Sequence, residues 1–239
     1  MTLYRDVGVV LRTYKLGEAD RIIVFCTQNS GKVRAVAKGV RKTKSKFGSR
    51  LEVGSHVLLQ LYEGRGDLDI VNQAELVETG LELRSDLTRM GRVASMLEAV
   101  DGVIQEGQAN PAMYEMLVGG LRAVAKWDTA LVTPAFFFRL LEAEGVGLQV
   151  EGCAVCGETD ELVSIDMDQG GLRCTQHREG MAISPQAVLI LQLILGGRVA
   201  TALALPAGPA IFEVEHLASK MLERHLDRRL RSLHVFDHT

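Results

Sequence analysis

The first 80 residues alternate between apolar and polar positions over short segments that end in turn residues. Segments rich in Val, Ile, Leu and Tyr are each followed by Gly, Asn or Asp, and they cover 7–16, 21–28, 32–39, 55–62 and 68–76. This pattern is typical of β-strands joined by tight turns. Five strands within about 75 residues predict a small closed barrel, with the OB-fold as the leading candidate.

From residue 81 the apolar positions recur every three or four residues, as in amphipathic helices. The first helical stripe consists of Leu83, Leu87, Met90, Ala94, Leu97, Val100 and Ile104. Asn110 followed by Pro111 marks the start of a second helix. The buried stripe expected after this start consists of Tyr114, Leu117, Leu121 and Val124.

Three further helices are predicted in the rest of the chain. One covers 134–145 and stops at Gly145, and the next begins at Ser184-Pro185 and stops at Gly196-Gly197. The last runs from about 210 to 233. Its apolar face consists of Leu222, Leu226, Leu230 and Leu233.

Between these helices, a Gly-rich stretch carries two pairs of metal-ligand residues. The pattern is C-x2-C, then 17 residues, then C-x2-H, and its members are Cys153, Cys156, Cys174 and His177. Two such pairs are the signature of a tetrahedral zinc ribbon or knuckle. Because four protein ligands leave no open position for water, we predict that one Zn2+ plays a structural role and holds an insert with little apolar content.

The same residues give less support to a catalytic metal site than to a structural one. The order His177, Arg178, Glu179 resembles the H-x-E of zinc deaminases, but it follows the C-x2-C pair instead of preceding it. No P-loop and no G-x-S-x-G motif is present. We therefore expect no catalytic residues and no enzymatic activity.

These patterns predict an α+β protein in three parts. An N-terminal five-stranded OB-fold β-barrel occupies 1–80, a helical domain occupies 81–150 and 181–239, and an inserted zinc-binding module occupies 151–180. The start of the chain lacks the apolar region of a secretory signal, and the longest apolar stretch, 187–195, is far shorter than the roughly 20 residues that span a bilayer. A cytoplasmic protein is the simplest expectation, and there cysteines favour metal binding over disulfides.

The charge is unevenly distributed. The protein has a formal net charge of −3, yet residues 1–80 hold 13 Lys and Arg against 9 Asp and Glu. The stretch 32–50 contains no acidic residue. Its eight cations are Lys32, Arg34, Lys38, Arg41, Lys42, Lys44, Lys46 and Arg50. A basic first third joined to an acidic remainder suggests different partners for the two parts.

This basic stretch is either a solvated loop or a nucleic-acid surface, and the second reading is favoured. Side chains alternate along a strand, so Lys32, Arg34 and Lys38 are expected to continue the loop's charge onto the outer face of the barrel. Phe47, flanked by Gly48 and Ser49, is expected to be an exposed aromatic among these cations. Cations that track phosphates, together with aromatic rings that stack on bases, are what single-stranded nucleic acid binding requires.

A second set of cations lies near the C-terminus, at helical spacing. Lys220, Arg224, Arg228 and Arg231 follow one face of the predicted last helix, opposite its leucines. Asp227 and Glu223 dilute this charge, and Asp227 is placed to pair with Arg231. The stripe is an auxiliary candidate for DNA contact.

Two long segments resemble a known family, the RecO recombination mediators. "GEADRIIVFCTQNSGKVRAVAKGVRKTKSKFGSRLE" is similar to the family's N-terminal OB-fold, and "FFFRLLEAEGVGLQVEGCAVCG…GGLRCTQH" is similar to its helical domain and zinc module. The resemblance covers nearly the whole chain. His177 stands where the family usually has a fourth cysteine, and Leu148 stands where members often have proline.

The resemblance implies a non-enzymatic role in recombinational DNA repair. RecO proteins bind single- and double-stranded DNA and anneal complementary strands without ATP. With RecR they help load the RecA recombinase onto DNA coated with single-strand binding protein (SSB), which implies a nucleoid-associated location in the cytoplasm. The family's DNA-binding segment falls on Lys38, Arg41, Lys42, Lys44, Lys46 and Arg50, and its metal ligands fall on Cys153, Cys156 and Cys174.

Two other classes of function stay open at this point. The basic loop could dock acidic protein tails, which would make the protein an interaction adaptor with incidental DNA binding. Alternatively, a metal site with an open coordination position would indicate a zinc-dependent nucleic-acid enzyme.

Overall fold

The computed structural model describes residues 2–64, 66–78, 80, 82–84 and 86–234 of the 239-residue chain. The chain forms two compact units. The barrel unit comprises 1–125 and 231–239, and the helical unit comprises 126–230. Each unit is described by itself below.

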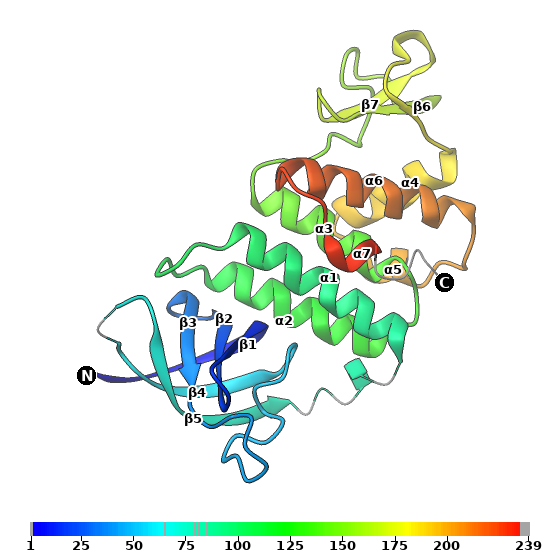
Figure 1. The fold of residues 1–239 in the computed structure, drawn as a ribbon. Helices are drawn as coiled ribbons and strands as arrows, with labels where there is room; N and C mark the ends of the chain where they lie inside the picture. The colour runs from blue at the N-terminus through cyan, green and yellow to red at the C-terminus, as the bar shows by residue number, and fades with distance from the viewer. Residues whose placement is uncertain (1, 65, 79, 81, 85, 235–239) are drawn as a thin grey trace. The chain divides into compact units, whose positions relative to one another are not determined.

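Five strands of the barrel unit close into a barrel in the order β1-β2-β3-β5-β4 (Figure 1). They are β1 (Leu3–Leu16), β2 (Asp20–Thr27), β3 (Gly31–Ala37), β4 (His56–Tyr62) and β5 (Asp69–Glu78). Neighbouring strands are antiparallel except for β3 and β5, which pair in parallel through only two residue pairs. A five-stranded Greek-key barrel of this kind is the OB-fold, as the sequence predicts.

The alternation along each strand sorts side chains between the barrel core and the outer surface. On β3, Val33, Ala35 and Ala37 are buried, while Lys32 and Arg34 lie on the outer side. The core is completed by apolar residues of every strand, among them Val10, Ile23, Phe25, Leu59, Leu61 and Val71. The period-two pattern therefore fixes which face of each strand points inward.

Helices α1 (Leu87–Val103) and α2 (Pro111–Lys126) belong largely to the barrel unit, together with the short helices η1 (Glu82–Arg84) and α7 (Arg231–His234). The carboxylate of Asp86 caps α1 by accepting from the backbone N–H of Arg89 at 2.8 Å. Asn110 accepts from the N–H of Met113 at 3.0 Å, which confirms the predicted start of α2. The predicted first stripe begins too early, since Leu87 is 69% exposed and Val93 is the first buried apolar side chain of α1.

The helical unit combines helices with a small three-stranded sheet (Figure 1). Its helices are α3 (Val132–Ala143), η2 (Thr175–His177), α4 (Pro185–Leu195), α5 (Val199–Leu203) and α6 (Pro209–His225). Its sheet has the order β7-β6-β8 and consists of β6 (Leu162–Asp166), β7 (Gly171–Cys174) and β8 (Met181–Ala182). Ser184 caps the start of helix α4 as predicted, because its hydroxyl accepts from the N–H of Ala187 at 3.2 Å.

The predicted last helix, 210–233, is interrupted. Helix α6 ends at His225, and Asp227 has a left-handed backbone with φ of 49°. Helical hydrogen bonding stops there, because left-handed conformations do not continue an α-helix. Leu222 and Leu230 are buried as expected, whereas the side chain of Leu233 lies outside the described part of the chain.

The two compact units group α1 and α2 with the barrel, and the predicted domain boundary at residue 80 stays a prediction. The bounds of the predicted insert, 151–180, stay a prediction. Within the described ranges, no helix is both long and apolar enough to cross a membrane.

Candidate nucleic-acid interface and metal centre

The basic segment, residues 38–50, connects β3 to β4 through a series of turns. It is anchored by Phe47 and by the adjoining Leu51, which are each 1% exposed and belong to the barrel core. Gly48 adopts a left-handed φ of 55° directly after Phe47. The segment is therefore a fixed part of the barrel surface, because two buried apolar side chains hold it in place.

The burial of Phe47 corrects the prediction that its ring is exposed for stacking on bases. Burying a phenyl ring removes a large apolar surface from water, and this outweighs the polar character of its neighbours. The ammonium of Lys46 lies 5.0 Å from the centre of the ring. Phe47 thus positions the basic segment and does not face a ligand.

Several cations of the segment also hold it against the barrel through backbone carbonyls. Arg41 donates to the carbonyl of Glu18 at 2.9 Å, on the turn between β1 and β2. Lys46 donates to the carbonyl of Asn72 on β5 at 2.7 Å, and Arg50 donates to the carbonyl of Lys46 at 2.8 Å. Neutral acceptors leave the positive charges uncompensated, so these residues still contribute to the surface field.

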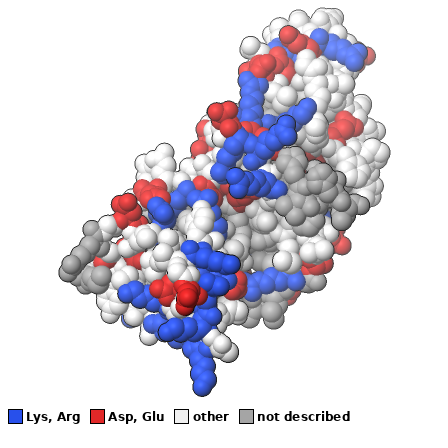
Figure 2. Space-filling model, viewed as in Figure 1, with Lys and Arg blue, Asp and Glu red and all other residues white. Residues whose placement is uncertain are grey.

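Lys38, Lys42 and Lys44 are exposed, and none of them forms an ion pair within the described ranges. Figure 2 shows Lys and Arg side chains gathered over the barrel, with a few acidic side chains among them. A surface of this composition attracts polyanions. It is the feature of the barrel unit best suited to nucleic acid.

Lys32 and Arg34, which the sequence assigns to the same surface, have acidic partners within the barrel unit. The Nζ of Lys32 lies 3.2 Å from Oδ1 of Asp101 on α1, and the Lys32 side chain is 13% exposed. The guanidinium of Arg34 lies 3.7 Å from Glu106, and this pair is more open to solvent. This ion pair argues against a DNA contact for Lys32, because a buried carboxylate compensates its charge, and the assignment of Lys32 to the DNA surface stays a prediction.

The four C-terminal cations do not share one helical face, contrary to the prediction. Lys220 and Arg224 lie on α6, and Arg224 forms an ion pair with Asp168. Arg228 follows the end of α6, and Arg231 begins α7, where its N–H donates to Glu98 at 3.1 Å. The helical spacing required for the predicted pairing of Asp227 with Arg231 is absent, because α6 stops at His225 and Arg231 begins α7.

The four predicted metal ligands converge on one point of the helical unit. The Sγ of Cys174 lies 3.8 Å from that of Cys156 and 3.4 Å from Nδ1 of His177, and the Sγ of Cys153 lies 3.9 Å from the same Nδ1. A tetrahedron with zinc–ligand distances of about 2.1–2.3 Å has edges of about 3.4–3.8 Å. The arrangement therefore fits a tetrahedral metal ion, and all four ligand atoms lie within 4.8 Å of one another.

The local backbone shapes this site for thiolate ligands. Gly157, with φ of 78°, donates its N–H to the carbonyl of Cys153 at 2.8 Å and closes the turn of the first pair. Burial acts to raise the pKa of the Cys153 thiol, but the backbone N–H groups of Cys174, Cys156 and Val155 outweigh it and lower the pKa from 9.0 to about 6. Thiolates are the form of cysteine that binds metal.

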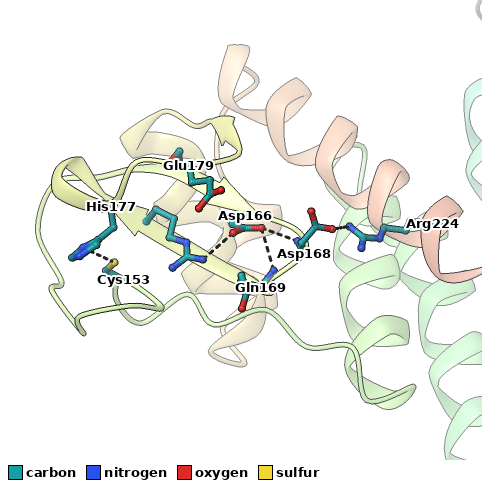
Figure 3. A network of polar contacts seen from close by, with 9 residues as sticks. Cys153, Asp166, Asp168, Gln169, His177, Glu179 and Arg224 are labelled. Atoms are coloured by element: carbon teal, nitrogen blue, oxygen red, sulfur yellow. Dashed lines mark hydrogen bonds and ion pairs between the residues drawn. The ribbon is translucent and has the colours of Figure 1, made fainter.

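A buried ion pair lies beside the metal ligands (Figure 3). Arg173, on the strand that ends at Cys174, donates to Asp166 at 2.8 Å, and this contact lowers the pKa of Asp166. Asp166 also accepts from the N–H of Asp168 at 2.8 Å, and Asp168 pairs with Arg224. This network ties the small sheet to α6 within the helical unit.

Four protein ligands would complete the coordination of a bound ion. The cluster is consistent with zinc, and a site of this kind supports structure instead of activating water. A bound ion would cross-link the C-x2-C turn to the end of β7, which lie about twenty residues apart in sequence.

Comparison with known proteins places the whole chain in one family. The family model described as "Recombination protein O N terminal" matches residues 1–79, and "Recombination protein O C terminal" matches residues 84–234. The chain belongs to the RecO family. The DNA repair protein RecO of Frankia casuarinae is 43% identical over 240 residues, covering 98% of both chains.

Other RecO relatives are similar over the same length. The DNA repair protein RecO of Streptomyces griseus is 41% identical over 244 residues, which cover 98% of both chains. That of Thermobifida fusca is 37% identical over 244 residues, which cover 99% of both chains. The RecO resemblance seen in the sequence is confirmed.

Sequence reasoning missed two buried acidic residues of this RecO chain that form ion pairs with its basic residues. Asp101 lies inside the α1 pattern and is buried against Lys32, and Asp166 is buried against Arg173. An acidic residue at a position that the helical period assigns to the buried face is the one signal that could have indicated Asp101.

Proposed function

We propose that this protein is a DNA-binding mediator of recombinational repair that acts without catalysis. It binds single- and double-stranded DNA and anneals complementary strands without ATP. With RecR it helps load RecA onto SSB-coated DNA. Membership of the RecO family and the name of its relatives, DNA repair protein, support the role in repair.

One observation supports the DNA-binding part above all. The basic segment is fastened to the barrel by Phe47 and Leu51, yet it leaves Lys38, Lys42 and Lys44 exposed without ion pairs in the part of the chain described. Because the backbone of the segment is already anchored, contact with phosphates requires ordering of the lysine side chains but not of the loop that carries them. Annealing needs screening of two phosphate backbones while the bases stay free to pair, and backbone contacts of this kind carry no base readout.

In this proposal the metal is one Zn2+, held by Cys153, Cys156, Cys174 and His177. When bound, it supplies a structural cross-link and no chemistry. Imidazole is as good a zinc ligand as a thiolate, so His177 in place of cysteine is compatible with the site.

The double reversal Lys42→Glu and Lys44→Glu tests the role of the basic segment. Fluorescence anisotropy with a labelled oligonucleotide should show the affinity falling by at least about a hundredfold, since each phosphate contact contributes to a steep salt-dependent term. The matched control is Lys126→Glu with Arg198→Glu, which changes the net charge equally in the other unit and should leave affinity nearly unchanged. An equal loss of DNA affinity in both double variants would show that only the net charge of the protein matters, and would contradict the proposal.

The adaptor alternative makes a different forecast in the same assay. If the protein is an adaptor, an acidic peptide should still bind at salt concentrations where DNA no longer binds. In the repair proposal, peptide and oligonucleotide lose affinity together as salt rises, and the oligonucleotide binds more tightly throughout.

A further inference from the structure

A row of side chains on the outer face of the barrel combines an exposed aromatic ring with apolar neighbours. Tyr14 on β1 is paired with Ile22 on β2, and Ile22 is paired with Val36 on β3. These three residues, here called the Tyr14 row, alternate with the core residues Ile23 and Ala35, so they face outward. Tyr14 is 43% exposed, and the other two are half-buried.

The ring of Tyr14 is oriented before any ligand arrives. The guanidinium carbon of Arg12 lies 5.1 Å from the centre of the ring, on the same face of β1. Arg12 is itself held by Asp101, at 3.0 Å between Nη1 and Oδ2. A ring fixed in this way loses little freedom when a flat partner stacks on it.

The outer face is closed on one side of this row. Val24 faces outward in the neighbouring row, between Arg12 and Arg34, and yet it is fully buried. The chain after α1 lies along β3 there, where the N–H of Lys32 donates to the carbonyl of Gln105 at 3.1 Å and Glu106 faces Arg34. Acidic groups would repel phosphates, so a bound strand must end near Arg34.

On the other side the row opens onto the basic segment. The chain leaves β3 at Ala37 and continues directly into Lys38, and Arg41 lies over the turn between β1 and β2. The half-buried carboxylate of Asp20 accepts from the N–H of Gly39 at 2.7 Å, which fixes it against the start of the basic segment. Cations therefore flank an apolar, partly aromatic floor.

We propose that the Tyr14 row is a base-stacking platform for single-stranded nucleic acid, reached by a strand whose phosphates follow the basic segment. This inference rests on the proposed function and adds the place where unpaired bases lie. In OB-folds the outer face of the second and third strands, which are β2 and β3 here, is a common binding site for oligonucleotides. Bases of a duplex are already stacked on each other, so the platform favours single strands over double strands.

Photocrosslinking of the full-length protein tests the location directly. An oligonucleotide containing 5-iodouracil is bound and irradiated, and the protein is cleaved after Glu and Asp. The four tyrosines then fall into separate peptides, which are 1–6, 7–18, 53–63 and 107–115. The adduct is expected on 7–18, at Tyr14. An adduct found on the other peptides and not on 7–18 would overturn the platform.

Affinity measurements separate this inference from the proposed function. Tyr14→Ala should weaken single-stranded DNA binding by about tenfold to a hundredfold, the effect of losing one stacked base, with little change for a duplex. Tyr14→Phe keeps the ring and should bind normally, and Tyr62→Ala, on β4, is the control.

The outcomes point to different failures. If wild type binds and the Lys42 and Lys44 reversal abolishes binding while Tyr14→Ala changes nothing, the platform is wrong and the proposed function stands. If Tyr14→Phe loses as much affinity as Tyr14→Ala, the contact is not stacking, and the platform is again wrong. If wild type binds no DNA, both fail.

Discussion

The ammonium group of Lys32 lies 3.2 Å from Oδ1 of Asp101, and this pair joins the third strand of the barrel to helix α1. The same ammonium donates to the backbone carbonyl of Asp101 at 2.6 Å. A lysine that belongs to a basic stretch in the sequence is thus a structural residue in the fold. Its charge compensates a buried carboxylate.

Replacement of Lys32 should therefore affect stability more than DNA binding. Lys32→Met keeps the aliphatic stem but leaves Asp101 with Arg12 as its cation, which should lower the free energy of unfolding by about 2 kcal/mol. Denaturant unfolding measures this, and anisotropy at a temperature where the variant is folded should show nearly wild-type affinity. Lys38→Met is the control. It should leave the free energy of unfolding nearly unchanged and weaken DNA binding. A stable Lys32→Met protein with weak DNA binding would contradict this assignment.

Substitutions of Phe47 also distinguish an effect on core packing from an effect on DNA binding. Phe47→Ala should lower the free energy of unfolding by about 3–5 kcal/mol, because it empties a fully buried site in the barrel. Phe47→Leu keeps most of the apolar volume and should cost far less. Because the ring does not face the solvent, the folded Leu variant should bind DNA like wild type. A large loss of affinity in Phe47→Leu at unchanged stability would show that the ring stacks on bases after all.

The stability of the barrel unit should fall in mild acid through His56. The Nε2 of His56 lies 2.7 Å from the hydroxyl of Tyr114, and its buried Nδ1 has no hydrogen-bond partner among the residues that the structure describes. Burial lowers the pKa of His56 below its usual 6.5. The folded state therefore binds a proton less readily than the unfolded state, and the stabilising effect of neutral His56 is complete above pH 6.5 and is lost as pH falls below it.

His56→Gln isolates this term, because the glutamine amide can still reach Tyr114 but does not titrate. Between about pH 7 and pH 5, the wild-type free energy of unfolding should fall more steeply than that of the variant, by at most about 1.4 kcal/mol per pH unit. Urea unfolding across this range provides the measurement. Parallel pH profiles for the two proteins would rule out His56 as the source.

Removal of the metal should loosen the small sheet of the helical unit. Cys174→Ser removes a buried ligand and should abolish stoichiometric zinc binding and lower the melting temperature, because metal binding and local folding are coupled. His177→Cys restores a common four-cysteine site and should keep the metal. Cobalt substitution reports both, since the absorption bands of a tetrahedral thiolate site should appear in wild type and in His177→Cys. Full cobalt binding by Cys174→Ser would contradict the four-ligand site.

Local patterns predicted most of the architecture but not the partners of charged residues. The period of two along residues 1–80 yields the five strands, since alternation depends only on the strand itself. The two ligand pairs are short-range patterns as well, and the structure brings them together. In contrast, Asp101 and Lys32 are 69 residues apart, and nothing near either residue in sequence indicates the other.

Phe47 and the end of α6 show the same limit. The neighbours of Phe47 are cations, glycine and serine, so the sequence resembles an exposed loop, and burial depends on the barrel below it. The leucine period continues beyond His225, but Asp227 turns the chain in a left-handed conformation that the period does not reveal. A helical period predicts that cations share one face only for residues that lie within the same helix.

The most direct test of the central claim is ATP-free annealing of two complementary oligonucleotides at about 50 mM and about 200 mM salt. If the fixed basic segment screens the two phosphate backbones, wild type should accelerate annealing strongly at low salt and much less at high salt. The Lys42→Glu, Lys44→Glu variant should show no acceleration at either. Undiminished annealing by that variant, or acceleration that is insensitive to salt, would contradict the account.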